Sequence, residues 1–474
     1  MEDPRPFCIG GRWKTGRETI PVIYPFTGEK VASVCIGSVA DLTLGAVFAA
    51  ESFQETRALP LYERRMVLTT IAELLFERRD ELISTLILEG GKVRKVAEGE
   101  VFRAIETIRI SAEEAGRVIG SILPLDRTAG GAGRTGYLTR VPVGPILAIT
   151  PFNYPLNLAC HKIGPAIAAG APFLLKPATA TPLSSLILAE IILSAGYPRE
   201  AVSVIPAPGA VANEIISDDR FGYLSFTGSP DVGWQIKNRA GRKKVGLELG
   251  GNAAVIVCGD ADLEYAASRI IAGGFVNAGQ NCVSVQRVLI QREIYAEMTE
   301  RICAGAQKLK VGDPEDPNTD VGPMISIEAA LRTQEEIRSA RISGARLLTG
   351  GKRDGALLQP TILSDVGIEL PISCREIFAP VILLTPFQTV DEAIAIVNSS
   401  SYGLQAGIFT DSLQIAQNAF SAIDVGAFMV NDVPTFRVDE MPYGGVKESG
   451  TGREGPACAI REMTVEKMMV VNKR

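Results

Sequence analysis

The sequence predicts an α/β protein with two doubly wound domains, each built on a parallel sheet, and a small β arm. Three observations support this fold class. Short β-rich runs alternate with helical stretches from about residue 145 to 251, a second such series runs from 253 to 432, and a glycine-flanked extended segment precedes both. This alternation is typical of βαβ units, in which helices join parallel strands. A chain of 474 residues is long enough for two cores.

The elements follow in order along the chain. Residues 40–120 are predicted to be helical, because "YERRMVLTTIAELLFERRDELISTLILEGG" places apolar residues at three- and four-residue spacing, and Gly90-Gly91 would stop a helix. Glycines then flank "YLTRVPV", which is typical of a hairpin arm. The predicted strands of the first series are "PILAIT" (145–150), "PFLLK" (172–176), "AVSVIPA" (201–207), "YLSFTGS" (223–229) and "KKVGLELGG" (243–251). The second series runs from "AAVIVCG" (253–259) to "GAFMVND" (426–432).

Composition argues against several classes of protein. The net charge is −6 and no basic stripe is present, so we expect no nucleic-acid partner. No apolar run is long enough to span a bilayer, and the first residues lack a signal pattern. The eight cysteines are scattered without a CxxC pair, so neither a disulfide scaffold nor a metal site is expected. A reduced, cytoplasmic protein with no membrane partner is the simplest expectation.

Cys282, in "NAGQNCVSV" (277–285), is the candidate nucleophile. Free cysteine is often buried and inert, which is the alternative interpretation. Gly279, Gln280 and Asn281 nevertheless form a loop that would present the thiol at the start of a strand with its backbone N–H free. Attack requires a thiolate, so a neighbouring group must accept the proton.

The base and the oxyanion donor have separate candidates. His161, the only histidine, lies in an apolar helical run, where a structural imidazole is favoured. Glu248, in "LELGGN", is better suited, since burial raises the pKa of a carboxyl group toward neutrality; a structural ion pair is its alternative. Asn153, in "TPFNYPLN", offers an amide to an oxyanion.

A nucleotide site is suggested by two further segments, although the GxGxxG fingerprint is absent. Gly228 and Gly233, in "SFTGSPDVG" (225–233), bracket a helix start where backbone amides would approach a phosphate; a simple turn is equally consistent. Lys176 follows a strand at its carboxyl end, where it would reach a ribose or a phosphate, or simply face solvent.

Together these residues resemble the aldehyde dehydrogenase superfamily along nearly the whole chain. The motifs that carry the resemblance are "ITPFNYPLNL", "LLKPA", "SFTGS" with Gly233, "LELGGN", "GQNC", "EIFAPV" (376–381) and "MPYGGVKESGTGREG" (441–455). The resemblance implies the fold of that superfamily, with a Rossmann-like cofactor domain. The implied segments are a cofactor domain (1–122 and 143–249), a catalytic domain (250–440), an oligomerisation arm (123–142 and 456–474) and a return to the cofactor domain (441–455).

The resemblance also implies a reaction. The Cys282 thiolate would add to an aldehyde to give a thiohemiacetal, whose oxyanion the Asn153 amide and the Cys282 N–H would hold. Hydride would leave for a nicotinamide, and Glu248 would activate the water that hydrolyses the thioester. Glu376 and Lys176 would bind the two riboses. The implied cofactor-binding residues are Thr150, Pro151, Lys176, Thr179, Phe226, Thr227, Gly228, Ser229, Gly233, Leu249, Glu376 and Phe378.

Two departures from the family pattern bear on the cofactor. Members that prefer NAD commonly carry a glutamate three residues after the lysine, where this chain has Thr179. A hydroxyl does not repel a 2′-phosphate, so NADP is expected alongside or ahead of NAD. Ala379 stands where the family usually has glycine, and nothing is concluded from it.

The substrate is expected to be a small aldehyde, in keeping with the lactaldehyde, phosphonoacetaldehyde and semialdehyde dehydrogenase-type members. Arg103 and Arg437 would border its tunnel and hold an anionic group, or else form surface ion pairs. Tyr154 would wall the pocket or serve packing. Asn281, in place of a cation before the nucleophile, weakens the case for a phosphate or phosphonate.

The arm implies self-association as a homodimer or homotetramer, since "GYLTRVPV" and "EKMMVVN" would otherwise leave open strand edges. A coenzyme A-acylating dehydrogenase is the alternative within the family. A hydrolase using Glu248, Lys176 and Cys282 is a more remote one, and a non-enzymatic protein would show a gap in the catalytic set.

Overall fold

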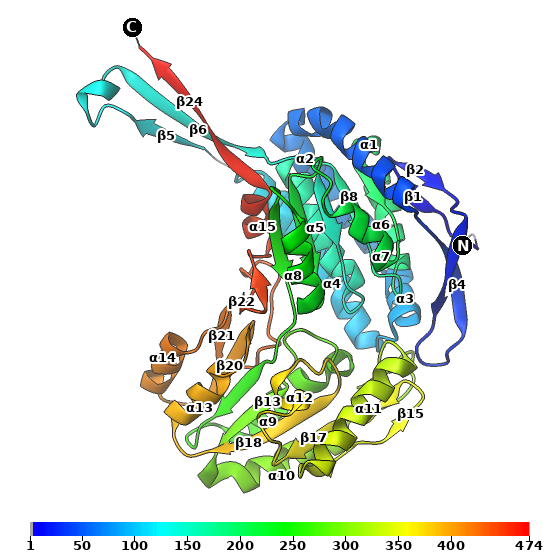
Figure 1. Ribbon diagram of the computed structural model, residues 1–474, viewed down its shortest axis with the longest axis vertical. Coiled ribbons are helices and arrows are strands. Elements are labelled where there is room, and N and C mark those ends of the chain that lie inside the picture. Colours follow the sequence, from blue (N-terminus) through cyan, green and yellow to red (C-terminus); the bar gives the residue numbers. More distant parts are fainter. Residues whose placement is uncertain (1–2, 119, 474) are drawn as a thin grey trace.

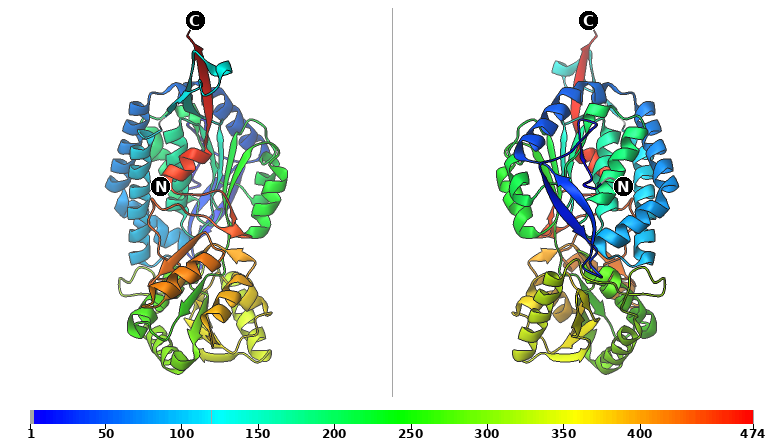
Figure 2. Two further views of the ribbon diagram at one scale, coloured as in Figure 1. Left: turned by 90° about the vertical axis from the view of Figure 1, so that its left-hand side faces the viewer. Right: turned by 90° about the vertical axis from the view of Figure 1, so that its right-hand side faces the viewer.

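The computed structural model describes residues 3–118 and 120–473, which form two lobes and a projecting arm. Figure 1 shows the first lobe at the top, with the helices of the first half of the chain, and the second lobe below it. The views in Figure 2 show helices on both faces of the sheet in each lobe. The predicted α/β class, with two sheets and an arm, is confirmed.

The first lobe contains an eight-stranded sheet in the order β2-β1-β9-β8-β7-β10-β11-β23. The five strands from β9 to β11 are parallel, whereas β1, β2 and β23 are antiparallel additions at the edges. The strands are β1 (Phe7–Ile9), β2 (Arg12–Lys14), β7 (Ile146–Ile149), β8 (Phe173–Lys176), β9 (Val202–Val204), β10 (Tyr223–Thr227), β11 (Lys244–Glu248) and β23 (Gly450–Thr451).

The chain reverses direction across this sheet between β7 and β10. From the central β7 it moves outward through β8 to β9, and it then returns to the other side of β7 as β10 and β11. Ligands of open parallel sheets bind at such a switch point, outside the carboxyl ends of the strands. The segments after β7 and β10 contain Asn153 and Gly228.

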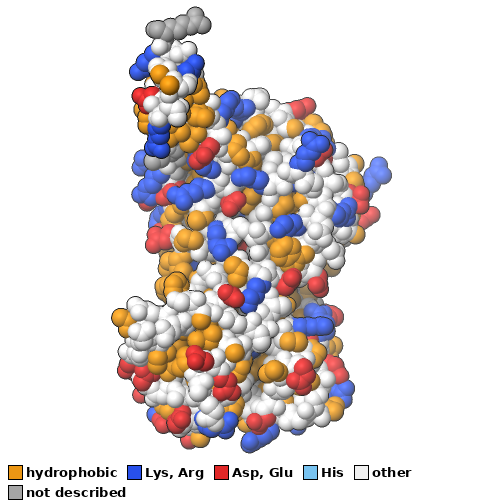
Figure 3. Space-filling view, turned by 60° about the vertical axis from the view of Figure 1, so that its left-hand side comes forward, with side chains coloured by type: hydrophobic (Ala, Val, Ile, Leu, Met, Phe, Trp, Pro, Cys, Tyr) orange, Lys and Arg blue, Asp and Glu red, His pale blue; other side chains and the backbone are white. Residues whose placement is uncertain are grey.

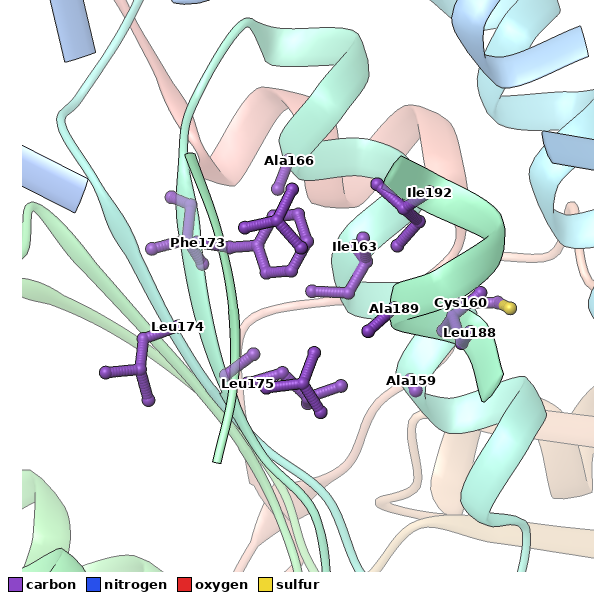
Figure 4. Packing of buried hydrophobic residues seen from close by; sticks show 14 of the residues in the cluster. Ala159, Cys160, Ile163, Ala166, Phe173, Leu174, Leu175, Leu188, Ala189 and Ile192 are labelled. Atoms are coloured by element: carbon purple, nitrogen blue, oxygen red, sulfur yellow. The ribbon is translucent and has the colours of Figure 1, made fainter. Parts of the chain in front are cut away.

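Helices cover both faces of the first sheet. In β8, Phe173 and Leu175 point toward α5 and α6, whereas Leu174 points to the opposite face (Figure 4). This alternation is the two-residue period of a strand. Every residue of α5 is buried, including the polar Asn157, His161 and Lys162. The helices of this lobe are α1 (Val39–Ala58), α2 (Leu61–Glu77), α3 (Arg79–Gly90), α4 (Arg94–Ala115), α5 (Pro155–Ala169), α6 (Leu183–Ser194), α7 (Gly209–Ala212), α8 (Pro230–Arg239) and α15 (Pro456–Glu462).

The predicted stop at Gly90-Gly91 is confirmed, because α3 ends at Gly90 and Gly91 adopts a left-handed conformation with φ 65°. Between β9 and β10 the chain forms only the short α7 and a single 3₁₀ turn, Asn213–Ile215.

The second lobe contains a seven-stranded sheet in the order β14-β17-β18-β13-β12-β20-β21, parallel except for β14. Its strands are β12 (Ala254–Val257), β13 (Arg287–Gln291), β14 (Arg346–Thr349), β17 (Thr361–Ser364), β18 (Val381–Phe387), β20 (Gln405–Phe409) and β21 (Ala427–Val430). Its helices are α9 (Leu263–Phe275), α10 (Tyr295–Lys308), α11 (Ile327–Ile342), α12 (Pro371–Cys374), α13 (Val390–Asn398) and α14 (Leu413–Ala422).

The arm is a three-stranded antiparallel sheet of β5 (Ser121–Pro124), β6 (Arg134–Pro142) and β24 (Thr464–Asn472). β24 pairs with β6 along its whole length, from Thr464 opposite Pro142 to Asn472 opposite Arg134. Only the strand of the predicted segment 456–474 lies in the arm, because α15 packs against α4 and α5. Figure 3 shows hydrophobic side chains gathered on the arm.

Three short antiparallel pairs complete the structure. The pairs are β3 (Glu18–Ile23) with β4 (Lys30–Ile36), β15 (Arg353–Asp354) with β16 (Leu357–Leu358), and β19 (Tyr402–Gly403) with β22 (Val446–Lys447). The segment 441–455 touches both lobes, since β22 pairs with β19 and β23 pairs with β11.

Among the residues that the structure describes, no helix has both the length and the apolarity to cross a bilayer. In the same ranges, no cluster of three or more His, Cys, Asp or Glu side chains is arranged to hold a metal ion. All eight cysteines are free thiols.

Candidate active site

The loop before Cys282 has an unusual backbone. Asn277, Ala278 and Gly279 adopt left-handed conformations in succession, with φ of 52°, 54° and 68°. Such conformations are costly for residues other than glycine and persist only where the surroundings hold them. The buried Gln280 holds this loop: its side-chain oxygen accepts a hydrogen bond from the Ile325 N–H at 2.8 Å.

The Cys282 sulfur lies half-buried at the end of this loop. It is 2.9 Å from the Tyr443 hydroxyl and 3.6 Å from the Asn281 side-chain oxygen. Burial raises the pKa of the Cys282 thiol well above its usual range, and the nearby Glu248 carboxylate raises it further. The thiol is therefore protonated at neutral pH and needs a base to become a nucleophile.

Glu248, the last residue of β11, is only 3% exposed and lines the same cleft as Cys282. Burial raises the pKa of Glu248 to about 7, and the negative charge of Glu454 adds to that shift. Its Oε1 has no hydrogen-bond partner among the described residues. Glu248 can thus exchange a proton near neutral pH, as a general base must.

A buried charged pair lies behind Glu248. The Lys162 ammonium donates to the Ser225 and Thr227 hydroxyls at 2.9 and 2.8 Å and is 3.0 Å from the Glu454 carboxylate. Burial favours the neutral form of Glu454, but the charges of Lys162 and Arg437 outweigh it and lower the pKa of Glu454 to about 2. Glu454 is therefore ionised when Glu248 takes up a proton.

His161 belongs to a different network. Its Nε2 is 2.9 Å from Asp439 and 3.5 Å from the Thr107 hydroxyl. Burial lowers the pKa of His161, so the imidazole is neutral. Its contacts are with α4 and with the loop that carries Asp439, and none is with Cys282, which agrees with the expected structural role.

Asn153 follows β7 and lines the same cleft as Cys282 and Glu248. Its amide donates to the Gln280 carbonyl at 3.2 Å, and its own backbone carbonyl accepts from Lys92 and Asn277. These bonds fix the Asn153 amide beside the nucleophile loop, with a second N–H still available to an oxyanion.

The cleft has a volume of about 320 Å³ and lies at the switch point of the first sheet. This volume lies within the range of small-molecule and cofactor sites. The lining residues are Pro151, Phe152, Asn153, Thr227, Gly228, Ser229, Glu248, Leu249, Gly250, Cys282, Glu376 and Phe378.

The start of α8 forms one wall of the cleft. Ser229 precedes the helix, and Pro230 at its first position fixes a helical φ without needing a hydrogen-bond acceptor. A side chain at Gly233 would meet the Leu249 methyl at 2.3 Å, so only glycine lets α8 pack this closely. Phe226 lies buried under Gly228.

Glu376 forms the opposite wall, where its carboxylate accepts a hydrogen bond from the Gly251 N–H at 3.0 Å. Burial raises the pKa of Glu376 to about 8. Phe378 packs edge-on against Phe152 with a left-handed φ of 54°. Ala379 has no positive φ and is buried in the core of the second lobe, so its methyl group causes no strain.

The remaining cofactor candidates lie outside this cleft. Lys176 is the last residue of β8, and burial alone lowers its pKa to about 8, with no carboxylate nearby to offset it. Thr179 is half-buried in the turn that follows. The Thr150 hydroxyl is buried and has no partner among the described residues.

The two candidate substrate arginines flank Tyr154 and Tyr443. Arg103, on α4, is 31% exposed and forms a two-pronged ion pair with Asp439 at 2.8 and 3.1 Å. Arg437 has a side chain only 9% exposed, with its guanidinium 3.6 Å from the centre of the Tyr443 ring and 3.4 Å from the Glu454 carboxylate. Arg103 lies 6.0 Å from the centre of the Tyr154 ring. Both arginines thus form ion pairs, Arg103 with Asp439 and Arg437 with Glu454, and the carboxylate partner of each pair is largely buried.

Three residues of this site were not singled out by the sequence. Tyr443 stands in the "MPYGG" segment, Glu454 in "GREG", and Lys162 in an otherwise apolar helical run. A lysine inside such a run was the one local signal, because an unpaired buried ammonium is costly.

The site thus combines a thiol, a carboxylate of near-neutral pKa and an amide at the switch point of a nucleotide-type sheet. Residues 13–469 match the aldehyde dehydrogenase family, and the chain belongs to that family. The predicted family and the predicted enzyme class, an aldehyde dehydrogenase, are confirmed.

Individual relatives cover nearly the whole chain. A 3-sulfolactaldehyde dehydrogenase of Priestia megaterium is 43% identical over 465 residues, 98% of this chain and 97% of its own. The crystal structure of aldehyde dehydrogenase 21 from Physcomitrella patens, in complex with the reaction product succinate, superimposes with a TM-score of 0.97 at 40% identity and covers 100% and 99% of the two chains. A glyceraldehyde-3-phosphate dehydrogenase, GapN, from Methanocaldococcus jannaschii complexed with NADP gives 0.93 at 37% identity and covers 96% and 100%.

Proposed function

We propose that this enzyme oxidises a small anionic aldehyde to its carboxylic acid, with NADP or NAD as the hydride acceptor. The observation that carries the proposal is the convergence of Cys282, Glu248 and Asn153 on one cleft at the switch point of the first sheet. A nucleotide bound there supplies a nicotinamide that accepts hydride from the substrate carbon.

The reaction of the protein groups follows from their positions. Glu248 takes the thiol proton, and the Cys282 thiolate attacks the aldehyde carbon, while the Asn153 amide and the Cys282 N–H stabilise the oxyanion. Loss of hydride converts the thiohemiacetal into a thioester. Glu248 releases the thiol proton to solvent and then removes a proton from the water that attacks the thioester, and the C–S bond breaks to release the acid and the Cys282 thiolate.

Hydrolysis is favoured over transfer to coenzyme A by the environment of Glu248. A carboxylate with a pKa of about 7 beside the nucleophile is suited to activate water. Omission of coenzyme A separates the two reactions, because an acylating enzyme stops after one turnover without it.

The cleft and the adjacent strand ends fit a dinucleotide. Glu376 offers a half-buried carboxylate to ribose hydroxyls, and the start of α8 offers backbone N–H groups to phosphate. Lys176 is a half-buried cation for which no carboxylate partner is found among the described residues, so an anion or ribose would compensate for its partial burial. Thr179, in place of a carboxylate, leaves room for a 2′-phosphate, and GapN was crystallised with NADP. We therefore place NADP first.

The charges beside the cleft favour a substrate with a single negative charge. Arg103, Arg437 and Lys162 contribute three positive charges, against two from the carboxylates of Asp439 and Glu454. Burial opposes ionisation of Asp439, but its contacts with His161 and Arg103 lower its pKa below the usual range. Among these five groups one positive charge is left without a partner, which suits a carboxylate or a sulfonate.

The first experiment compares initial rates of reduced-nicotinamide formation for succinic semialdehyde and butanal, each with NADP and with NAD. We expect kcat/KM to favour the acid by more than about tenfold, or ~1.4 kcal/mol.

Arg103→Ala should remove that preference, since it deletes a charge-assisted contact of this size. Arg109→Ala, on the same helix and paired only with Glu106, is the matched control. Equal kcat/KM for the two aldehydes would contradict anion recognition, and turnover without nucleotide would contradict oxidation.

A further inference from the structure

Tyr443 makes the shortest polar contact of the candidate nucleophile, and no role has yet been assigned to it. Its hydroxyl lies 2.9 Å from the Cys282 sulfur. Tyr443 is only 1% exposed, and its backbone forms hydrogen bonds in both directions with Glu454. The ring therefore has a fixed position, and the contact with sulfur is not the chance result of a mobile side chain.

The surroundings strengthen the phenol as a hydrogen-bond donor. The Arg437 guanidinium lies over the face of the Tyr443 ring at 3.6 Å, and a cation there favours negative charge on the phenol oxygen. Tyr443 also packs against the buried apolar side chains of Val283 and Leu404. A hydrogen bond is stronger in such a dry environment than in water.

The direction of the hydrogen bond follows from the charges that face the sulfur. Glu248 and Glu376 oppose a negative charge on Cys282, whereas the contact with Tyr443 favours it. Burial also raises the pKa of Tyr443 well above its usual range, so the phenol keeps its proton. When the thiol loses its proton to Glu248, the sulfur becomes acceptor only, and the phenol must donate.

We propose that Tyr443 is a catalytic residue whose phenolic O–H donates to the Cys282 sulfur whenever that sulfur carries negative charge. This occurs first when the thiol proton passes to Glu248. It occurs again when the C–S bond of the thioester breaks and its electron pair returns to sulfur as the leaving thiolate. The second step rests on the proposed function, whereas the first depends only on the chain itself.

Tyr443→Phe tests the first step without any aldehyde. The variant keeps the ring, its packing and the contact with Arg437, and removes only the hydroxyl. The readout is the rate of Cys282 alkylation by iodoacetamide as a function of pH, followed by peptide mass spectrometry. We expect the midpoint of the profile to move up by about one pH unit, so that alkylation at pH 7 slows about tenfold.

Tyr197→Phe is the matched control, because it deletes an equally buried hydroxyl that donates to the Ala171 carbonyl, far from Cys282. Its alkylation profile should equal that of the parent enzyme. Cys282→Ser identifies the alkylated peptide. An unchanged midpoint in a folded Tyr443→Phe variant, or a Cys282 that iodoacetamide does not modify in the parent enzyme, overturns the proposal.

A second variant covers the case in which Tyr443→Phe does not fold. Fluorotyrosine at position 443 keeps the hydroxyl and makes it more acidic, so the midpoint should move down instead of up. A midpoint that stays in place overturns the proposal. Failure of aldehyde oxidation would contradict the proposed function and leave this result intact, because alkylation uses neither aldehyde nor nucleotide.

Discussion

At the scale of single residues, the environment of Glu248 predicts how activity depends on pH. The pKa of Glu248 is about 7, and its deprotonated form is the base, so kcat should rise with pH and level off above that value. Glu248→Gln should lower kcat by about 10²–10⁴-fold and remove this rise. The measurement is kcat against pH, with mass spectrometry of quenched enzyme to detect a thioester on Cys282.

The Gln variant should slow both halves of the reaction, because Glu248 also takes the thiol proton, but hydrolysis of the thioester should slow more, since water is a far weaker acid than a thiol. A burst of reduced nicotinamide followed by a slow phase is therefore expected. An unchanged steady-state rate would exclude Glu248 as the base.

Some of these residues were predictable from the sequence and others were not. Asn153 follows β7 and Glu248 ends β11, where an alternating α/β pattern indicates the functional edge of a sheet. Cys282 lies in the loop before β13, and its small, amide-rich neighbours were the signal there. Tyr443 reaches the sulfur from 161 residues away in the chain, and Lys162 reaches Glu454 across 292 residues. No local period or spacing encodes such a contact, because it depends on how two distant segments pack.

At the scale of elements, the nucleophile loop requires glycine at position 279. Its φ is 68°, and an added Cβ would lie 2.0 Å from the Ala379 carbonyl oxygen, much closer than atoms can approach. Gly279→Ala should therefore shift the loop and displace Cys282. We expect kcat/KM to fall by at least about 10²-fold, because small displacements of reacting groups have effects of this size.

Gly355→Ala is the matched control, because it strains the backbone without displacing the active-site loop. Gly355 has a similar φ of 56° in the turn between β15 and β16, but open space surrounds its Cα. The Gly355→Ala substitution should lower the free energy of unfolding by about 1 kcal/mol and leave kcat/KM unchanged. Thermal unfolding and kinetics of both variants provide the comparison. Full activity in Gly279→Ala would contradict a fixed loop.

The regular elements were the most predictable part of the structure. Strands with continuous apolar runs, such as "ILAI" in β7, are buried on both faces and can be recognised from the sequence alone. The edge strands cannot be recognised in this way. β2 and β23 are two or three residues long and belong to the sheet only because β1 and β11 lie beside them. Tertiary packing, not local pattern, determines such strands.

At the scale of the whole molecule, the arm leaves an exposed apolar edge that a second chain would cover. β24 pairs with β6 on one side only, and its Met468, Met469, Val470 and Val471 are exposed. Exposed apolar strand edges are prone to pair with another chain, and large exposed apolar patches mark interfaces. We infer that this edge joins subunits, in agreement with the expected homodimer or homotetramer.

Met469→Glu tests this inference, because a carboxylate in an apolar interface must lose its hydration without gaining a partner. Met469 is 60% exposed in the single chain, so the substitution should not affect folding. We expect sedimentation velocity to show a smaller species and the dissociation constant to rise at least about tenfold, since burying an uncompensated charge costs more than ~1.4 kcal/mol.

Ile342→Glu is the matched control: Ile342 is 73% exposed at the end of α11, away from the arm, so the same charge there should leave the mass unchanged. If Met469→Glu sediments as the parent protein does at every concentration, the arm does not join subunits through this edge, and the apolar residues of β24 need another explanation.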